Sequence, residues 1–290
     1  MGQSENIDIL EVGLRDGLQI LPQVIPTTAK LSLLNGLIQA GCRRIEVTSF
    51  VNSKRISQFE DAEKLISQLP NFPDVKFSAL VLNEKGLERA LDTGMKRIET
   101  SFSTTETHSR KNVRMSLNET HAAMKNVLKK ARNSGIHVRG GLQCVWGCVY
   151  DGVPPAERIE RMIEIMIGIG VNSISLADST GMATPNAIST ILDRILPKVG
   201  EIPVSLHFHN VREKGYENLC AALKLGIRNF DTSFGGFGGC PAIIGAQGNI
   251  STEKTVQVLR RMGFRTNIDG DAVSRVSRQL GGLINQTTML

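Results

Sequence analysis

The stretch QAGCRRIEVTSF, residues 39–50, contains the local pattern on which the fold of this chain depends. A helical segment ends at Gly41, which suits the left-handed position that closes a helix, and a β-rich run follows within a few residues. The same pattern recurs at DTGMKRIETSF (92–102), NSGIHVRGGLQCV (133–145), GIGVNSISLADS (168–179) and KLGIRNFDTSF (224–234). The repeat predicts five strands, each entered from a preceding helix.

Three further strands bring the predicted number to eight. VKFSALVLN (75–83) and IPVSLHFHN (202–210) follow proline-containing breaks, and residues 7–12 form the opening strand. Helix-like segments such as TTAKLSLLNGLIQA (27–40) lie between the strands. Eight strands alternating with helices along one uninterrupted chain predict an α/β fold, a single (β/α)8 TIM barrel spanning residues 1–290. The competing architecture is a doubly wound sheet, but the GxGxxG turn that it usually has after its first strand is absent.

The composition excludes several classes of function. Hydrophobic residues make up 41% and charged residues 21% of the 290 positions, and no apolar stretch is long enough to cross a bilayer. The net charge is +6, but Lys and Arg are spread along the chain and aromatic residues are only 4%. This pattern favours an anionic small substrate over nucleic acid. We therefore expect neither a membrane nor a nucleic-acid partner.

The amino terminus and the cysteines indicate the cellular compartment. The opening residues MGQSENIDIL enter a strand at once and leave no room for the apolar region of a signal peptide. Five cysteines, an odd number without paired zinc spacing, fit reduced thiols. We expect a cytoplasmic protein, and one that forms a homodimer or another homo-oligomer.

Polar side chains gather where the predicted strands end, which is where TIM barrels hold their active sites. In EVGLRDGLQ (11–19), Arg15 and Asp16 stand between two glycines in a turn after the first strand. A solvated turn with an incidental ion pair is the alternative interpretation. The other candidates at strand ends are Glu46, Arg139, Asp178, His207 and His209.

The two strand histidines predict a metal site. His207 and His209 are two residues apart, so both imidazoles face the same side of the strand and can bind one ion. In the barrel they meet Asp16, and two histidines with one carboxylate leave positions on a divalent cation open for substrate oxygens. A pair of hydrogen-bonded histidines is an equally good interpretation of the spacing alone. Asn249 can add an amide oxygen, and it also fits an ordinary helix N-cap before ISTE.

Cys240 and Asp178 are candidates for proton transfer, and each also has a purely structural interpretation. Cys240 lies in the Gly-rich loop GGFGGCPAIIGAQGN (235–249), which can move over the barrel mouth as a lid. A thiol there suits proton transfer, and an inert thiol on a flexible connection is the alternative. Asp178, at the end of SISLADSTG (173–181), fits either a general base or a capping carboxylate.

Six motifs follow one another along nearly the whole chain: EVGLRDGLQ, RIEVTSFV, VRGGLQC, SLADSTGMATP, HFHN and GGFGGCPAIIGAQGNISTE. Together they resemble the 3-hydroxy-3-methylglutaryl-CoA lyases of the DRE-TIM metallolyase superfamily, and the last motif is the most specific. The resemblance implies cleavage of a 3-hydroxyacyl-CoA into acetyl-CoA and a keto acid, assisted by Mg²⁺ or Mn²⁺.

The resemblance also implies a role for each matching residue. The metal ligands would be Asp16, His207, His209 and Asn249. Arg15 would bind substrate and stabilise the thioester enolate, while Asp178 and Cys240 would transfer protons. Glu46 would support the site from beside it, and we expect Arg139 to contact the substrate.

The departures from the family pattern concern the substrate more than the reaction. The family usually has Pro at Leu14, Tyr at Gly141, Asp-Thr-Tyr-Gly at residues 210–213 and Tyr-Ala at residues 242–243. All the chemical positions are kept. The loss of Tyr at Gly141 and the gain of Arg212 indicate a roomier or differently charged acyl pocket, for example for citramalyl-CoA.

Three other functions fit part of the pattern. A carboligase that condenses acetyl-CoA with a 2-keto acid uses related chemistry, but we see no long carboxyl-terminal extension that forms a regulatory domain. A non-catalytic acyl-CoA-binding or metal-binding relative is disfavoured by the intact set of chemical residues. A basic nucleic-acid binder is disfavoured by the scattered charge.

Overall fold

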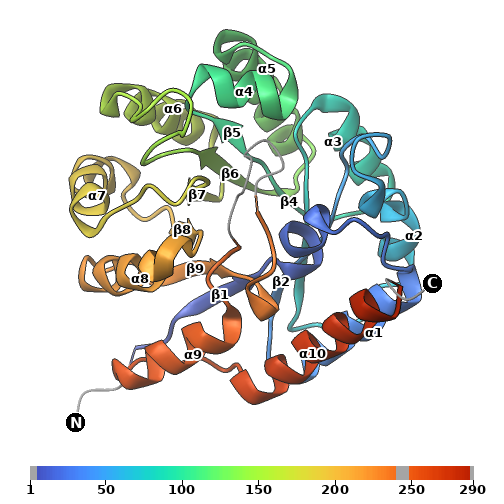
Figure 1. Cartoon of the computed structure of the whole chain (residues 1–290). Helices are drawn as coiled ribbons and strands as arrows, with labels where there is room; N and C mark the ends of the chain where they lie inside the picture. The colour runs from blue at the N-terminus through green and yellow to red at the C-terminus, as the bar shows by residue number, and fades with distance from the viewer. Residues whose placement is uncertain (1–4, 240–247, 288–290) are drawn as a thin grey trace.

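The computed structural model describes residues 5–239 and 248–287, which form a closed barrel of parallel strands (Figure 1). The strands are β1 (Asp8–Glu11), β2 (Arg44–Ser49), β3 (Lys76–Leu80), β4 (Arg97–Glu99), β5 (Phe102–Ser103), β6 (His137–Gln143), β7 (Ser173–Asp178), β8 (Val204–Phe208) and β9 (Asn229–Thr232). They pair in the order β4-β3-β2-β1-β9-β8-β7-β6-β5, and β4 also pairs with β6, which closes the sheet. The predicted TIM barrel is confirmed. Its predicted extent, residues 1–290, goes beyond the described residues and stays a prediction.

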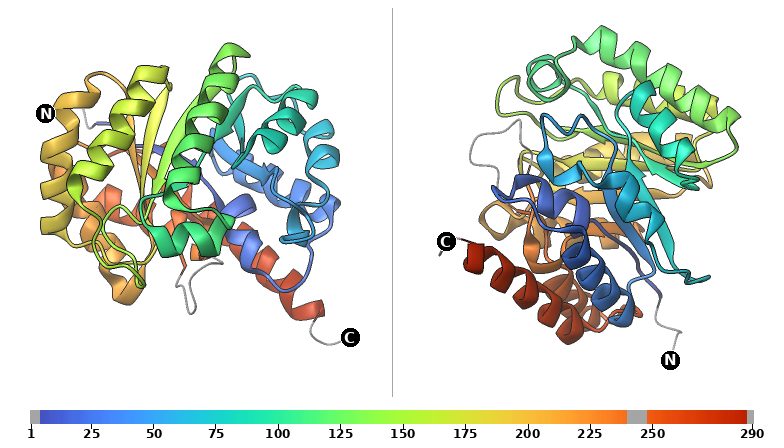
Figure 2. Two further views of the ribbon diagram at one scale, coloured as in Figure 1. Left: turned by 90° about the horizontal axis from the view of Figure 1, so that it is seen from above. Right: turned by 90° about the vertical axis from the view of Figure 1, so that its right-hand side faces the viewer.

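Helices surround the barrel, as Figure 1 shows. They are α1 (Thr27–Gln39), α2 (Ala62–Ser67), α3 (Glu84–Asp92), α4 (Glu106–Val113), α5 (Leu117–Asn133), α6 (Ala156–Ile169), α7 (Pro185–Val199), α8 (Lys214–Lys224), α9 (Thr252–Arg261) and α10 (Gly270–Thr287). The apolar core lies between helices and sheet, where Leu128 of α5 and Val138 of β6 are fully buried. The last helix, α10, packs along α1 on the outside of the barrel (Figure 2). In the described part of the chain, no helix is long and apolar enough to span a membrane.

Glycines end five of the helices, as the repeated sequence pattern predicts. The residue after α6 is Gly170, and it lies in the left-handed region with φ +82°. A side chain in that conformation clashes with the backbone, so glycine is favoured there. Positive φ angles are likewise found at Gly41, Gly94, Gly135 and Gly226. The next strand begins within a few residues of each of these glycines.

The fourth strand position differs from the prediction, because it holds two short strands rather than one. Between β4 and β5, the backbone N–H and the hydroxyl of Thr100 both donate to the carbonyl of Arg139, each at 2.9 Å. A side-chain donor that competes for a ladder carbonyl interrupts regular pairing. The chain also passes very close to β6 here, since a Cβ on Gly141 would lie 2.3 Å from the Thr100 carbonyl oxygen.

The segment after β1 forms a single wide helical turn, Gly13–Gly17, instead of continuing as strand. The N–H groups of Arg15 and Asp16 both donate to the Val12 carbonyl, at 3.0 and 2.7 Å. The buried Glu11 holds this turn in place, because its Oε1 accepts the N–H of Gly13 at 2.8 Å. The turn predicted at this position is therefore confirmed, and it directs two charged side chains into the barrel mouth.

Candidate active site

The three side chains predicted to hold a metal ion lie together at the carboxyl end of the barrel. Asp16, His207 and His209 are all buried, and one ligand atom of each lies within 4.8 Å of those of the others. His207 belongs to β8 and His209 follows directly after it, and the centroids of their imidazole rings are 5.3 Å apart. Asp16 approaches from the turn after β1, so residues far apart in sequence form one group of possible ligands.

Asn249 completes this group. Its Nδ2 donates to Asp16 Oδ2 at 2.7 Å and to the Phe237 carbonyl at 3.0 Å. Its Oδ1 is buried and has no hydrogen-bond partner in the described part of the chain. The alternative that Asn249 is a helix cap is wrong, because the cap of α9 is Ser251, whose side chain accepts the N–H of Lys254. An unpartnered amide oxygen beside a carboxylate and two imidazoles fits a divalent cation.

The protonation of Asp16 and His209 also suits a cation. Burial would raise the pKa of the Asp16 carboxyl, but the neighbouring Arg15 guanidinium and the two histidines outweigh burial and lower it. Burial lowers the pKa of His209 to about 4, and the charge of His207 acts in the same direction. His209 is therefore neutral at physiological pH, as a metal-binding imidazole must be.

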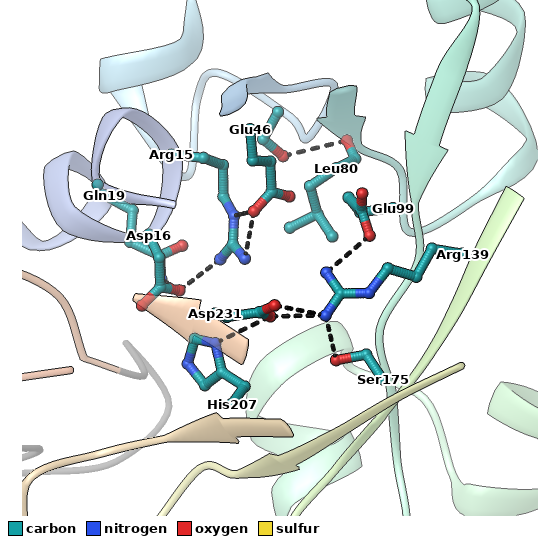
Figure 3. A network of polar contacts seen from close by, with 12 residues as sticks. Arg15, Asp16, Gln19, Glu46, Leu80, Glu99, Arg139, Ser175, His207 and Asp231 are labelled. Carbon is teal, nitrogen blue, oxygen red and sulfur yellow. Dashed lines mark hydrogen bonds and ion pairs between the residues drawn. The ribbon is translucent and has the colours of Figure 1, made fainter. Parts of the chain in front are cut away.

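His207 is oriented by a carboxylate that the sequence analysis did not identify. Its Nδ1 lies 3.3 Å from Oδ2 of the buried Asp231, on the neighbouring strand β9 (Figure 3). Burial would lower the pKa of His207, but the hydrogen bond to Asp231 and the nearby Asp16 raise it overall. Hydrogen bonding of the second ring nitrogen to a carboxylate is a common way to fix a metal-binding histidine.

Arg15 lies between two carboxylates at the edge of the cavity (Figure 3). Its Nε and Nη2 each lie 2.8 Å from Glu46 Oε2, and its Nη1 donates to Asp16. Burial raises the pKa of Glu46 to about 7, against the opposing effect of Arg15. These contacts hold the guanidinium in one orientation and leave N–H groups over for a ligand.

Arg139, the other predicted substrate-binding residue, is committed to protein partners on all three nitrogens. Its Nη1 donates to Glu99 at 3.0 Å, its Nη2 to Asp231 at 2.6 Å, and its Nε to Ser205 at 3.1 Å. The side chain also lines the cavity. This geometry favours a positioning role through Asp231, which in turn contacts His207, and direct contact with substrate stays a prediction.

The two predicted proton-transfer residues have different positions. Asp178 pairs in register with Phe208 and does not line the cavity, whereas its neighbour Ala177 pairs with His207 and does. Asp178 Oδ1 accepts the N–H of Met182 at 2.9 Å, so the carboxylate caps the turn after β7. Burial raises the pKa of Asp178 to about 6, and hydrogen bonds from backbone N–H groups of the turn, including that of Met182, oppose the rise. Cys240 and most of its loop lie outside the described residues.

A cavity of about 280 Å³ joins these groups at the barrel mouth. Polar residues that line it include Arg15, Asp16, Gln19, Glu46, Glu99, Arg139, Ser175, His207, His209 and Asp231. Apolar side chains from β3 and the segments before α2 and after α4, such as Leu80, Ile56 and Met115, line other parts of the wall. A cavity with mixed walls and convergent charged groups is typical of a site for a small molecule.

Among the polar cavity residues that the sequence analysis missed, three carried a usable signal. Gln19 ends the EVGLRDGLQ motif, and its Nε2 donates to Asp16 Oδ1 at 2.8 Å. Asp231 belongs to the same repeated strand pattern as Glu46. Glu99 is the clearest omission, because the tripeptide Arg-Ile-Glu that contains Glu46 (44–46) recurs at 97–99.

Comparison with known proteins places the chain in a family. The model of the HMGL-like family matches residues 6–280. The chain belongs to the HMGL-like family. The resemblance seen in the six sequence motifs is thereby confirmed.

Relatives with similarity along nearly their whole length support this assignment. The hydroxymethylglutaryl-CoA lyase of Bacillus subtilis is 37% identical over 268 residues, which cover 92% of this chain and 90% of that protein. The crystal structure of the Bacillus subtilis HMG-CoA lyase has a TM-score of 0.92 at 35% identity, covering 98% of this chain and 96% of the other. An HMG-CoA lyase from Acinetobacter baumannii, solved with coenzyme A and 3-methylmalate, has a TM-score of 0.90 at 34% identity, covering 98% of this chain and 93% of that one.

Proposed function

We propose that this member of the HMGL-like family is a metal-dependent carbon–carbon lyase. It cleaves a 3-hydroxyacyl-CoA of the 3-hydroxy-3-methylglutaryl-CoA type into acetyl-CoA and a keto acid. The observation that carries the proposal is the group formed by Asp16, His207 and His209, whose ligand atoms lie within 4.8 Å of one another in the cavity that also contains Arg15. The relative solved with coenzyme A supports an acyl-CoA as the substrate.

A divalent cation, Mg²⁺ or Mn²⁺, would be held by Asp16, His207, His209 and the free oxygen of Asn249. When bound, such a cation supplies Lewis-acid polarisation of substrate oxygens, which makes the 3-hydroxyl group easier to deprotonate. Asp231 keeps the His207 ring in position, and Asn249 keeps Asp16 in position through its amide N–H. The chain thus provides a preorganised set of oxygen and nitrogen ligands.

The protein groups then account for the bond changes. Loss of the proton from the 3-hydroxyl allows the bond between carbons 2 and 3 to break, and its electron pair moves onto the thioester oxygen. Arg15, held by Glu46 and Asp16, donates to that oxygen and stabilises its negative charge. A proton then adds to carbon 2 and gives acetyl-CoA, so that the two products together contain all the atoms of the substrate.

Two residues are proposed for the proton steps. Asp178 is proposed as the acceptor of the hydroxyl proton on the family resemblance, since its carboxyl caps the turn after β7 and does not line the cavity; its pKa of about 6 suits a base that is ionised at neutral pH. Cys240 donates the proton to carbon 2, as the family resemblance implies. The cytoplasmic location and the self-association expected from the sequence also stay predictions.

A substrate panel tests this function directly. The purified chain, loaded with Mg²⁺ or Mn²⁺, is incubated with several 3-hydroxyacyl-CoA thioesters, including 3-hydroxy-3-methylglutaryl-CoA and citramalyl-CoA, and acetyl-CoA is measured. We expect acetyl-CoA release that depends on the metal and stops on chelation. Absence of release from every thioester, in protein shown to bind the metal, would refute the proposal.

A further inference from the structure

Two glutamates occupy equivalent positions in the repeated Arg-Ile-Glu pattern and line the same cavity. Glu46 ends this tripeptide on β2 and Glu99 ends it on β4. Figure 3 shows their carboxylates on either side of the Leu80 side chain. Both residues are largely buried, with exposed fractions of 1% for Glu46 and 8% for Glu99. The mouth therefore has two acceptor groups from alternate strands on one wall.

Each glutamate uses only one of its two oxygens to hold an arginine. Glu46 Oε2 accepts from Arg15, and Glu99 Oε2 accepts from Arg139 at 3.0 Å. Glu46 Oε1 is buried and has no hydrogen-bond partner in the described part of the chain. A buried carboxylate oxygen without a donor is costly, and a ligand that donates a hydrogen bond removes that cost.

The charges around the pair restrict which donor fits. A second carboxylate on the ligand would be repelled, because the negative charge of Glu99 already raises the pKa of Glu46. A ligand ammonium would lie close to the guanidinium groups of Arg15 and Arg139, which are of like charge. A neutral hydroxyl meets neither repulsion, and it can donate to a carboxylate oxygen.

The wall near Glu99 has no side chain at one position. Gly141 follows Arg139 by two residues on β6 and lines the cavity without a side chain. The closeness of the Thr100 carbonyl, at 2.3 Å from a Cβ placed there, excludes any larger residue while the backbone keeps this position. The hydroxyl-bearing residues Ser101 and Ser175 line the same cavity, so this part of it is polar.

The wall lies across the barrel from the metal group. In the closed sheet, β4 is separated from β8 by β6 and β7 on one side and by β3, β2, β1 and β9 on the other. An acyl group that reaches from Asp16 and the histidines across the mouth therefore presents its far substituent to Glu99. Figure 3 shows Asp16 and Glu99 on opposite sides of the site.

We infer that Glu99, with the free oxygen of Glu46, selects acyl groups that carry a hydroxyl on the substituent directed toward β4. The inference rests on the lyase function proposed above and names its substrate class. The preferred substrates are 3-hydroxyacyl-CoA thioesters whose branch at carbon 3 is hydroxylated rather than a plain alkyl group. Cleavage of such a thioester gives acetyl-CoA and a keto acid that retains the extra hydroxyl.

A pair of substrates differing by one oxygen atom tests this specificity. The probes are the CoA thioesters of 3-hydroxy-3-methylglutarate and 3-hydroxy-3-(hydroxymethyl)glutarate, compared by kcat/KM at saturating Mn²⁺. We expect the wild-type chain to prefer the hydroxymethyl compound by about 10- to 100-fold, as for a hydrogen bond to a charged group. The second keto acid product would be 4-hydroxy-3-oxobutanoate.

The variant Glu99→Gln separates recognition from a purely structural role. Because Arg139 Nη1 donates to Glu99 Oε2, the amide oxygen of Gln faces Arg139 and its NH₂ group takes the place of the other carboxylate oxygen. We expect the preference to fall by about tenfold or more. The matched control is Ser205→Ala, which removes another hydrogen-bond partner of Arg139 that does not line the cavity. Its preference should equal that of the wild type.

The outcomes distinguish this inference from the function on which it rests. Release of acetyl-CoA from neither thioester would contradict the lyase function itself. Cleavage of the methyl compound with equal or greater efficiency would leave the lyase function standing and overturn the proposed specificity. An unchanged preference in folded Glu99→Gln would also overturn it. If that variant does not fold, Glu99→Asp withdraws the carboxylate by one methylene, and an unchanged preference there has the same meaning.

Discussion

Asn249 Nδ2 donates to Asp16 Oδ2 at 2.7 Å, while the Oδ1 of the same amide is buried and unpartnered in the described part of the chain. The two residues come from opposite ends of the barrel sequence and meet beside His207 and His209. One side chain therefore both orients a carboxylate and offers a further oxygen to a cation. This relationship makes the metal site testable independently of catalysis.

Replacement of Asn249 by Ala removes both contributions. We expect Mn²⁺ affinity, measured by isothermal titration calorimetry, to fall about 10- to 100-fold, as for loss of a group that supports a metal ligand. Asn218→Ala is a matched control, because Asn218 is also buried, its Oδ1 has no partner among the described residues, and it does not line the cavity. Wild-type affinity in Asn249→Ala would show that the amide is not part of the site.

The two histidines should each be necessary for metal binding. His207→Ala or His209→Ala removes a nitrogen ligand, and we expect both metal affinity and turnover to fall by at least about 100-fold. His137→Ala is the control, because His137 lies at the start of β6, the opposite end of the barrel. Normal metal content together with full activity in both variants would exclude this site.

Most of the fold followed from one local rule. Helix-closing glycines such as Gly170 fix where a helix stops, so the repeated pattern located the strands that follow. Parallel strands then bring their carboxyl ends to one edge, which is why Asp16 and His207 could be expected to meet. The interruption between β4 and β5 could not be predicted, because it depends on the contact of Thr100 with Arg139 on another strand.

The site residues that could be predicted are those that belong to local sequence motifs. The partnership of His207 with Asp231 depends on the register of β8 and β9, which no single motif states. The orientation of Asp178 shows the same limit. It pairs with Phe208 and does not line the cavity, which the motif SISLADSTG does not state, and its role as a base stays a prediction.

The role of Asp178 can be read from the pH dependence of turnover. A base must be ionised, and the raised pKa of about 6 means that kcat falls as pH drops through about 6. Asp178→Asn keeps an oxygen for the N–H of Met182 but cannot accept the proton. We expect at least about 100-fold loss of kcat with metal affinity retained. A loss below about tenfold with the acidic limb intact would leave Asp178 only its capping role.

Cys240→Ser tests the proton donor. A hydroxyl is a far weaker acid than a thiol, so single-turnover release of acetyl-CoA at saturating metal should slow strongly while substrate binding is kept. Cys220→Ser, on α8, is the control. A rate within about threefold of wild type corresponds to less than roughly 1 kcal/mol of barrier and would mean that another group donates the proton.

We expect the buried carboxyl of Glu11 to make the free energy of unfolding fall as pH rises. The fully buried carboxyl accepts hydrogen bonds from the N–H groups of Gly13 and Phe234 and from the hydroxyl of Thr252. Burial nevertheless raises its pKa from 4.5 to about 7. Between these values the folded chain keeps the proton that the unfolded chain has lost. The contribution of Glu11 to the free energy of unfolding therefore decreases as pH rises, by at most about 3 kcal/mol.

Glu11→Gln removes this titration while keeping the hydrogen bonds, because its amide oxygen accepts from Gly13 and Phe234 and its NH₂ group donates to Thr252. Urea unfolding at about pH 5 and about pH 8 gives the free energy of unfolding of both proteins. The other buried carboxyls are common to both and cancel in the difference. We expect the free energy of unfolding of the variant, relative to that of the wild type, to rise by about 1–3 kcal/mol from the lower to the higher pH, because only the wild type must ionise a buried carboxyl.

Glu88→Gln, at an exposed position of α3, controls for the removal of one carboxyl. The difference in free energy of unfolding between Glu11→Gln and the wild type could instead stay constant with pH or change in favour of the wild type. Either result would show that Glu11 is ionised in the folded chain at both pH values and that its hydrogen bonds outweigh burial.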